Sequence, residues 1–204
     1  APVFFWLLFI LQKDKLNPEP RYLIIKTFFA GLLSTSVVYR LTLSVQWFNL
    51  ESYILAPFIE EWTKFMVVVI IIYNHNAFDE PIDGIIYASA VWLGFATIEN
   101  IFYLADAWSV SKLISISTVR ALFTIPAHVL FASMWWYWLS MAKFNPNKKK
   151  KFIIRWLFLS IAFHILFNLW NGFGLIGGLL VILITGICRT IRHHKIMILK
   201  NIGD

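Results

Sequence analysis

The sequence consists mainly of long apolar runs that are separated by short polar segments. An α-helix of about 20 apolar residues crosses the hydrocarbon core of a bilayer, and most of these runs have that length. Backbone groups in lipid must be hydrogen-bonded within the protein, so such runs fold as helices and not as open sheets. The first run is too short to span alone, and we expect it to be part of a longer helix. The runs predict a single polytopic membrane domain over residues 1–204. Its seven transmembrane helices are expected at 1–11, 22–45, 52–73, 82–104, 114–142, 152–171 and 175–191.

The composition excludes a water-soluble fold. Hydrophobic residues make up 59% of the chain and charged residues only 14%, whereas soluble domains carry about 25% charged residues. So few charges do not cover the surface of a soluble domain. The single cysteine, Cys188, also excludes an internal disulfide and a cysteine-based zinc site. We therefore expect an all-α integral membrane protein, a helix bundle held together by packing.

The distribution of basic residues predicts the orientation of this bundle. Most of the 18 Lys and Arg residues lie in the segments 13–26, 143–155 and 189–200, which follow the first, fifth and seventh predicted helices. Because cytoplasmic loops retain Lys and Arg, we expect the N-terminus outside the cell and the C-terminus in the cytoplasm. The run Lys148–Lys151 then contacts anionic lipid, so the net charge of +7 predicts the lipid bilayer as a partner and not a nucleic acid.

A small set of ionisable residues lies inside the predicted spans. A charged side chain at mid-bilayer costs about 2.5–3.5 kcal/mol on insertion scales, so such residues face the bundle interior and often mark a functional site. Some of them could instead form structural ion pairs, since Glu60 and Lys64 are four residues apart and Arg120 could neutralise either Glu99 or Glu61. The set consists of Glu60, Glu61, Lys64, Glu99, Arg120, His128 and His164. A set of this size is harder to explain by ion pairs alone.

Counting residues along each helix predicts the depth of these side chains. With a rise of about 1.5 Å per residue, Glu60, Glu61, Glu99 and His164 all fall within about 14 Å of the outer membrane boundary. His128 falls about 20 Å below that boundary, which is about 8 Å too deep to share a metal ion with His164 if the helices are straight. The count predicts a polar pocket in the outer half of the membrane.

Residues of these types can hydrolyse a peptide bond. One glutamate can take a proton from water and a second acid can return it to the leaving amine, while His164 and Asn168 donate hydrogen bonds to the oxyanion. Alternatively, Glu99, His128 and His164 could hold a divalent metal such as zinc with an open position for water. The chain has neither the His-Glu-x-x-His zinc motif nor the Gly-x-Ser-x-Gly serine motif.

Two further groups of residues are expected to be structural. Asp79, Glu80 and Asp83 follow the third predicted helix and could bind a cation, but a hydrated cytoplasmic loop explains them better. Tryptophans such as Trp108 and Trp135 are expected near the ends of spans, where they anchor helices at the membrane interface.

Several motifs occur in a fixed order along almost the whole chain. They are Asp14–Arg21 (DKLNPEPR), Glu60-Glu61-x-x-Lys64, Pro81–Tyr87 (PIDGIIY), Phe95-x-x-x-Glu99-Asn100, Arg120 followed by His128, and His164-x-x-x-Asn168. With this set the chain resembles the PrsW-type intramembrane proteases. That family belongs with the CAAX prenyl endopeptidases to a larger group whose helices carry Glu-rich and His-rich motifs. The CAAX enzymes would have His in place of Glu99, so they match less well.

The resemblance implies a peptidase in the cell membrane of a bacterium or archaeon. Its substrate would be a single-pass membrane protein, such as an anti-sigma factor, cleaved near its extracytoplasmic side. The implied catalytic residues are Glu60, Glu61, Glu99 and His164, supported by Lys64, Asn100, Arg120, His128 and Asn168. Two mechanisms stay open: water activated by a glutamate, or water activated by a metal, zinc for example, at Glu99, His128 and His164.

Three other functions fit part of the pattern. A CAAX-like processing enzyme would share the fold and much of the site. A transporter would also bury ionisable residues, but it predicts an inverted repeat, and the sequence has no visible repeat. A non-catalytic membrane scaffold would tolerate the loss of Glu61 or His164, and both residues are present.

Overall fold

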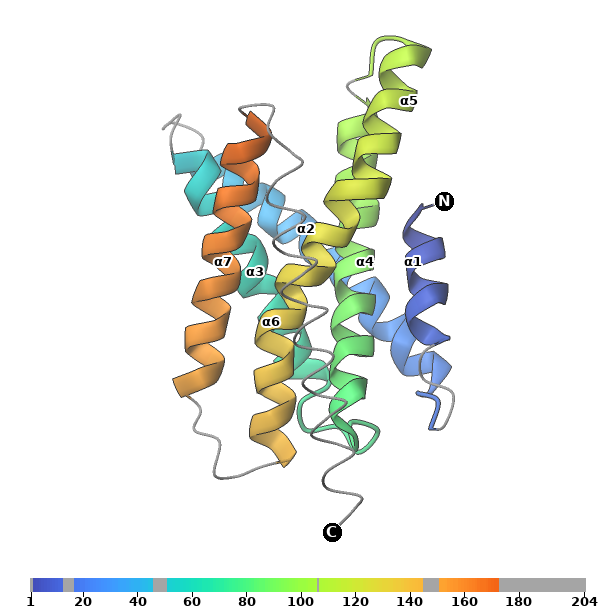
Figure 1. Ribbon diagram of the computed structural model, residues 1–204, viewed down its shortest axis with the longest axis vertical. Coiled ribbons are helices and arrows are strands. Elements are labelled where there is room, and N and C mark those ends of the chain that lie inside the picture. The colour runs from blue at the N-terminus through green and yellow to red at the C-terminus, as the bar shows by residue number, and fades with distance from the viewer. Residues whose placement is uncertain (1, 13–16, 46–50, 106, 145–150, 173–204) are drawn as a thin grey trace.

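The structure of the protein is a computed structural model that describes residues 2–12, 17–45, 51–105, 107–144 and 151–172 (Figure 1). Its elements are α1 (Pro2–Leu11), α2 (Arg21–Val45), α3 (Glu51–Ile71), α4 (Pro81–Ala105), α5 (Val110–Val119), η1 (Arg120–Thr124), α6 (Ile125–Phe144) and α7 (Lys151–Gly172). Within the described ranges there is no strand, which confirms the all-α fold for this part of the chain. The predicted helix over 175–191 lies outside the described residues.

Among the described residues, three helical segments are long and apolar enough to cross a membrane. They are Arg21–Thr42 in α2, Pro81–Ala105, which is α4, and the continuous rod Val110–Phe144 formed by α5, η1 and α6. α7 contributes a shorter apolar stretch, Ile153–Leu169. α3 has 21 residues, but its middle turns carry a cluster of charged side chains. These lengths agree with a membrane-embedded bundle.

Apolar side chains fill the interior of the bundle and also cover much of its outside. Val68, Val91 and Leu157, from α3, α4 and α7, belong to one buried cluster. On the outside, Leu33 is 65% exposed and Ile70 is 74% exposed. A surface of this kind is unfavourable in water but is solvated well by lipid chains, which supports the membrane location.

Two glycines allow α2 and α4 to touch through their backbones. A Cβ atom added to Gly31 would lie 1.9 Å from the carbonyl oxygen of Val91, and one added to Gly94 would lie 1.9 Å from that of Phe28. Small residues at such crossings let membrane helices approach closely and gain van der Waals contact. The crossing holds α4 in register, and α4 carries several residues of the site described below.

The rod Val110–Phe144 begins earlier than the predicted helix over 114–142. Its start is capped by Ser109, whose hydroxyl oxygen accepts a hydrogen bond from the backbone N–H of Lys112 at 3.2 Å. α5 has no buried residue, and Figure 1 shows it projecting beyond the neighbouring helices. The first turns of the rod therefore lie outside the packed bundle.

The rod contains one π-helical turn, η1, just before Pro126. In this turn the backbone N–H of Ile125 donates to the carbonyl of Arg120, five residues earlier. Pro126 has no N–H and cannot make the next such bond, to the carbonyl of Ala121. The indole Nε1 of Trp6 in α1 donates to this carbonyl over 3.4 Å instead. A side chain of another helix thus satisfies the backbone group that the proline leaves open.

The loop before α4 is more ordered than the sequence predicts. Asp83 is fully buried, and its Oδ2 accepts hydrogen bonds from the backbone N–H groups of Asp79, at 3.0 Å, and Glu80, at 2.6 Å. One turn later, the hydroxyl of Tyr87 donates to buried Glu19, which precedes α2. The expectation of a hydrated loop is wrong for Asp83, because its carboxylate caps the start of α4.

Candidate active site

Glu60, Glu61 and Lys64 of α3 point into the bundle. The Nζ of Lys64 lies 3.1 Å from Oε2 of Glu60 and 3.2 Å from Oε1 of Glu61. It also lies 4.2 Å from the ring centroid of Phe95 in α4. The side chain of Glu61 is 0% exposed, whereas that of Glu60 is 13% exposed. The ion pair expected within α3 is present, and Lys64 shares it between both glutamates.

Glu61 is held by donors from three helices. Besides Lys64, it contacts Nδ1 of His164 at 3.2 Å and accepts from the indole Nε1 of Trp135 at 3.4 Å. The hydroxyl of Ser160 lies 3.4 Å from its Oε2 and donates its hydrogen over the shorter distance of 2.7 Å to the carbonyl of Phe131. The carboxylate of Glu61 therefore connects α3 to α6 and α7.

This contact also fixes the orientation of His164. A carboxylate only accepts hydrogen bonds, so the contact with Glu61 places a proton on Nδ1 and, in the neutral ring, leaves the lone pair on Nε2. Nε2 lies 4.0 Å from Oε2 of Glu60. The ring is buried and stacks on Phe131, with 5.2 Å between centroids and 17° between planes. Glu61 thus turns the free nitrogen of His164 toward Glu60.

His128 of α6 lies beside His164, with 4.4 Å between the two ring centroids. Its ring stacks on Trp92 of α4 at 5.0 Å. His128 is 2% exposed, and its Nδ1 has no hydrogen-bond partner among the described residues. A buried nitrogen without a partner is costly unless something binds it.

The depth predicted for His128 is wrong. The count started at residue 114 as if that residue lay at the membrane boundary. The helix starts at Val110, and α5 projects beyond the neighbouring helices. Part of the counted length therefore lies outside the bundle, and His128 reaches the level of His164.

Glu60, His128 and His164 can each offer one ligand atom, and these atoms lie within 4.8 Å of one another. Two imidazoles and a carboxylate are a common ligand set of catalytic zinc. Nδ1 of His128 has no partner among the described residues and is free to bind an ion, and the carboxylate of Glu61 holds Nδ1 of His164 as carboxylates commonly hold metal-bound histidines. Lys64 contacts Oε2 of Glu60 at 3.1 Å and would compete with an ion for this carboxylate. The residues fit a divalent metal.

Glu99 forms the ion pair with Arg120 that the sequence allowed as an alternative, and it is not the carboxylate grouped with the histidines. Its Oε2 accepts from Nη2 of Arg120 at 2.8 Å, and Nε of Arg120 donates to Oδ1 of Asn100. The guanidinium group lies 4.2 Å from the ring centroid of Tyr103. Glu99 is therefore engaged by Arg120, and the carboxylate that the structure groups with the two histidines is Glu60. The sequence-based metal set is corrected in this one residue.

The predicted site residues thus form two groups. Glu60, Glu61, Lys64, His128 and His164 form the central cluster, and Glu99, Asn100 and Arg120 form an ion-paired group on α4 and η1. Asn168 is half-buried and lies one turn beyond His164 in α7.

Sequence reasoning missed the residues that support the central cluster. Ser160 precedes His164 by four residues, so a small polar residue on the same helix face was an available signal. Trp92 and Phe131 stack on the two histidines and look like ordinary core residues in the sequence. Trp135 was expected at the membrane interface, but it is 1% exposed and contacts Glu61.

Comparisons with known proteins agree with this chemistry. The model of the PrsW family intramembrane metalloproteases matches residues 19–190. The protein named Protease PrsW from Oceanobacillus iheyensis is 36% identical over 174 residues, which cover 82% of this chain and 78% of that protein. Proteins of the same name from Bacillus subtilis and Clostridioides difficile are each 30% identical, covering 79% and 82% of this chain and 73% and 74% of their own lengths. No solved structure matches the chain.

Proposed function

This chain belongs to the PrsW family of intramembrane metalloproteases and is a peptidase, and from this premise we propose that Glu60 activates the water that cleaves its substrate. The observation that carries the proposal is the difference between its two adjacent glutamates. Glu60 has access to the space between the histidines, whereas Glu61 is enclosed by donors.

Glu61 is poorly suited to accept a proton from water. Its oxygens already face Lys64, His164 and Trp135, and its side chain is 0% exposed. Protonating it would disrupt each of these contacts. Glu60 has one charged partner, Lys64, and is 13% exposed, so a water molecule can reach it. We assign Glu60 as the general base and Glu61 as the residue that holds His164 and Lys64.

The remaining groups support one addition and elimination sequence. The oxygen of water adds to the peptide carbonyl carbon while its proton passes to Glu60. Asn168, one turn from His164, donates an amide N–H to the oxyanion that develops. Protonated Glu60 then returns the proton to the amide nitrogen as the carbon–nitrogen bond breaks. Nε2 of His164 accepts a hydrogen bond from the attacking water and orients it.

A metal-dependent form is the second candidate, favoured by the three ligand atoms that lie together. Glu60, His128 and His164 would hold the ion, and Glu60 would then be a ligand instead of the base. A divalent ion such as zinc would supply a Lewis acid that polarises the scissile carbonyl. In both forms the position of His164 depends on Glu61.

We propose further that the substrate is a single-pass membrane protein, such as an anti-sigma factor, and that it is cleaved near its extracytoplasmic side. A membrane-embedded bundle with an apolar outside supports a substrate that reaches the enzyme through the bilayer. The charge asymmetry of the sequence supports a multi-pass arrangement in the cell membrane with the cluster in the outer half.

Co-expression with tagged candidate substrates tests the function. A panel of single-pass anti-sigma factors, tagged at both ends, is expressed with the wild-type chain, with Glu60→Gln, or with Glu80→Gln as a matched control on an exposed acid. We expect cleavage by the wild type and the control, and a loss of at least about 10²-fold with Glu60→Gln. Full cleavage by Glu60→Gln would refute the role of Glu60, and a panel left intact by the wild type would refute the substrate class.

His128→Ala separates the two mechanisms. His128 has no role in direct activation of water by Glu60, but it is a ligand in the metal-dependent form. If the purified wild type contains about one equivalent of metal and the variant loses both metal and activity, the metal-dependent form holds. A variant that keeps its activity, with no metal in either protein, supports the glutamate mechanism.

A further inference from the structure

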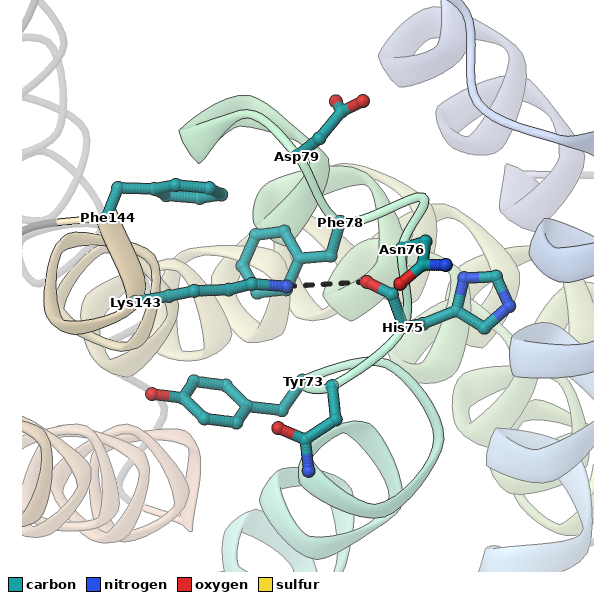
Figure 2. A pocket seen from close by; sticks show the side chains of 8 residues that line it. Tyr73, His75, Asn76, Phe78, Asp79, Lys143 and Phe144 are labelled. Atoms are coloured by element: carbon teal, nitrogen blue, oxygen red, sulfur yellow. Dashed lines mark hydrogen bonds between the residues drawn. The ribbon is translucent and has the colours of Figure 1, made fainter.

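A cavity of about 450 Å³ lies at the end of the bundle where α3 leads into α4 and where α6 ends. It is lined by residues 73–76, 78 and 79 of the connecting loop and by Lys143 and Phe144 of α6 (Figure 2). The loop begins twelve residues beyond Glu61 in the sequence, which is about 18 Å along a helix. The cavity is thus separate from the central cluster, and it is open to the surface at this end of the bundle.

Lys143 brings a positive charge to this cavity that no acid pairs with directly. Its Nζ donates to the carbonyl of His75 at 3.4 Å and lies 4.2 Å from the ring centroid of Phe78. Within the described part of the chain, no carboxylate oxygen lies within 4.0 Å of this Nζ. An ammonium group has three N–H donors, and the carbonyl uses one of them. The other two are available to a ligand.

The nearby acids have other partners. Oδ1 of Asp79 accepts from the amide of Asn17 at 3.1 Å, and Figure 2 shows this side chain directed away from Lys143. Asp83 is buried and caps α4 through the backbone N–H groups of Asp79 and Glu80. Both carboxylates attract the charge of Lys143 from a distance, but neither lies within 4.0 Å of its Nζ, so its remaining N–H donors stay open to a ligand.

Neutral donors and aromatic rings complete the lining. The amides of Asn74 and Asn76 border the cavity from the exposed loop, and Tyr73 and Phe144 border it with their rings. The imidazole of His75 is fixed by the backbone N–H of Ala77, which donates to Nδ1 at 3.1 Å. The site therefore combines one cation, neutral N–H donors and apolar walls, which suits a phosphate group attached to an apolar body.

We propose that this cavity binds the phosphate of an anionic phospholipid in the cytoplasmic leaflet. Lys143 is the charged donor, and Asn74 and Asn76 are the neutral ones. The predicted orientation places this end of the bundle at the cytoplasm, where anionic lipids are concentrated. Near an anionic leaflet each Lys contributes about 1 kcal/mol to binding, which is roughly fivefold in affinity. The proposal does not depend on the mechanism of proteolysis.

Lipid retention by the purified chain tests the proposal. The protein is extracted from vesicles of phosphatidylglycerol or of phosphatidylcholine, and retained lipid is counted by native mass spectrometry. We expect the wild type to retain phosphatidylglycerol preferentially and Lys143→Gln to retain roughly fivefold less. Lys112→Gln, which alters an exposed lysine of α5, is the matched control and should retain as much as the wild type. Equal retention by both variants, or equal retention of both lipids, overturns the proposal.

Two additions keep the outcome decisive. Inorganic phosphate at millimolar concentration should not displace the lipid, and full displacement would show that the cavity takes a free anion instead of a headgroup. If Lys143→Gln cannot be purified, the double variant Asn74→Ala, Asn76→Ala takes its place, because both side chains lie on an exposed loop. We expect this variant to retain less phosphatidylglycerol, and unchanged retention would contradict the assignment.

Discussion

Glu60 and Glu61 should respond in opposite ways to the same conservative substitution. Glu61→Gln should lower the free energy of unfolding strongly, whereas Glu60→Gln should mainly remove activity. Breaking a buried ion pair by removing one partner costs about 3–5 kcal/mol. Glu61 is 0% exposed, and the change would alter its contacts with Lys64, His164 and Trp135. Because Lys64 keeps Glu60 at 3.1 Å, we expect the lower end of that range, about 3 kcal/mol.

The expected cost of Glu60→Gln is smaller. Its side chain is 13% exposed, and its one charged hydrogen bond, from Lys64, can be taken over by Glu61 at 3.2 Å. A hydrogen bond to a charged group contributes about 1.5 kcal/mol at the lower end of its range, and we expect a loss of that size or less. The same substitution removes the proposed base and should reduce hydrolysis by at least about 10²-fold.

Both quantities can be measured on the same purified proteins. The free energy of unfolding is obtained by titrating SDS into mixed micelles and following tryptophan fluorescence, and the cleavage rate is measured on a substrate that the wild type cleaves. Glu80→Gln should change neither quantity. The assignment of roles is wrong if Glu60→Gln is as unstable as Glu61→Gln, or if Glu61→Gln is fully stable and only inactive.

Three further outcomes follow from the orientation and the packing. A cysteine placed at Ser109, in a background without the native cysteine, should react with an impermeant thiol reagent on intact cells, while one at Asn147 should not. The reverse pattern would place the central cluster in the cytoplasmic half. Gly94→Ala should lower the free energy of unfolding by about 1–3 kcal/mol or more, because the new Cβ would lie 1.9 Å from the Phe28 carbonyl oxygen. Wild-type stability of this variant would contradict the close crossing. Trp6→Phe should cost about 1 kcal/mol in the same SDS titration, since the π-turn carbonyl loses its indole donor, and no loss would mean that another group satisfies it.

Hydropathy predicted most of the described helices to within two residues at each end. The ranges 22–45, 52–73, 82–104 and 152–171 correspond to α2, α3, α4 and α7. This works because a helix in lipid must be both continuous and apolar. The start of the rod before η1 was harder to predict, because the serines and Lys112 of α5 lower its hydropathy. Its start was still visible in Ser109, a typical N-cap residue, which hydropathy alone ignores.

The sequence allowed two of the observed ion pairs, Glu60 with Lys64 and Arg120 with Glu99, but it did not predict which carboxylate lies beside the histidines. Burying a charge in lipid is costly, so ionisable residues inside spans mark a candidate site by their presence alone. Which residues meet depends on how each helix is rotated about its axis and on where it enters the membrane. Glu99 was placed with the histidines for this reason, although Arg120 engages it at 2.8 Å. The level of His128 was misjudged because one end of its helix projects from the bundle.

The adjacent pair of glutamates shows how one helix turn can separate structure from chemistry. Neighbouring residues on an α-helix point about 100° apart, so Glu60 and Glu61 meet different groups of the bundle although both contact Lys64. The side chain of Glu61 points toward Trp135 and Nδ1 of His164, and these donors occupy its carboxylate. The side chain of Glu60 points toward Nε2 of His164, and its carboxylate stays accessible. Lys64 follows both by about one turn and contacts each, so the two carboxylates share a single cation. Exchanging either glutamate for an uncharged residue would therefore also change the electrostatics of the other, and their effects on activity should not be additive.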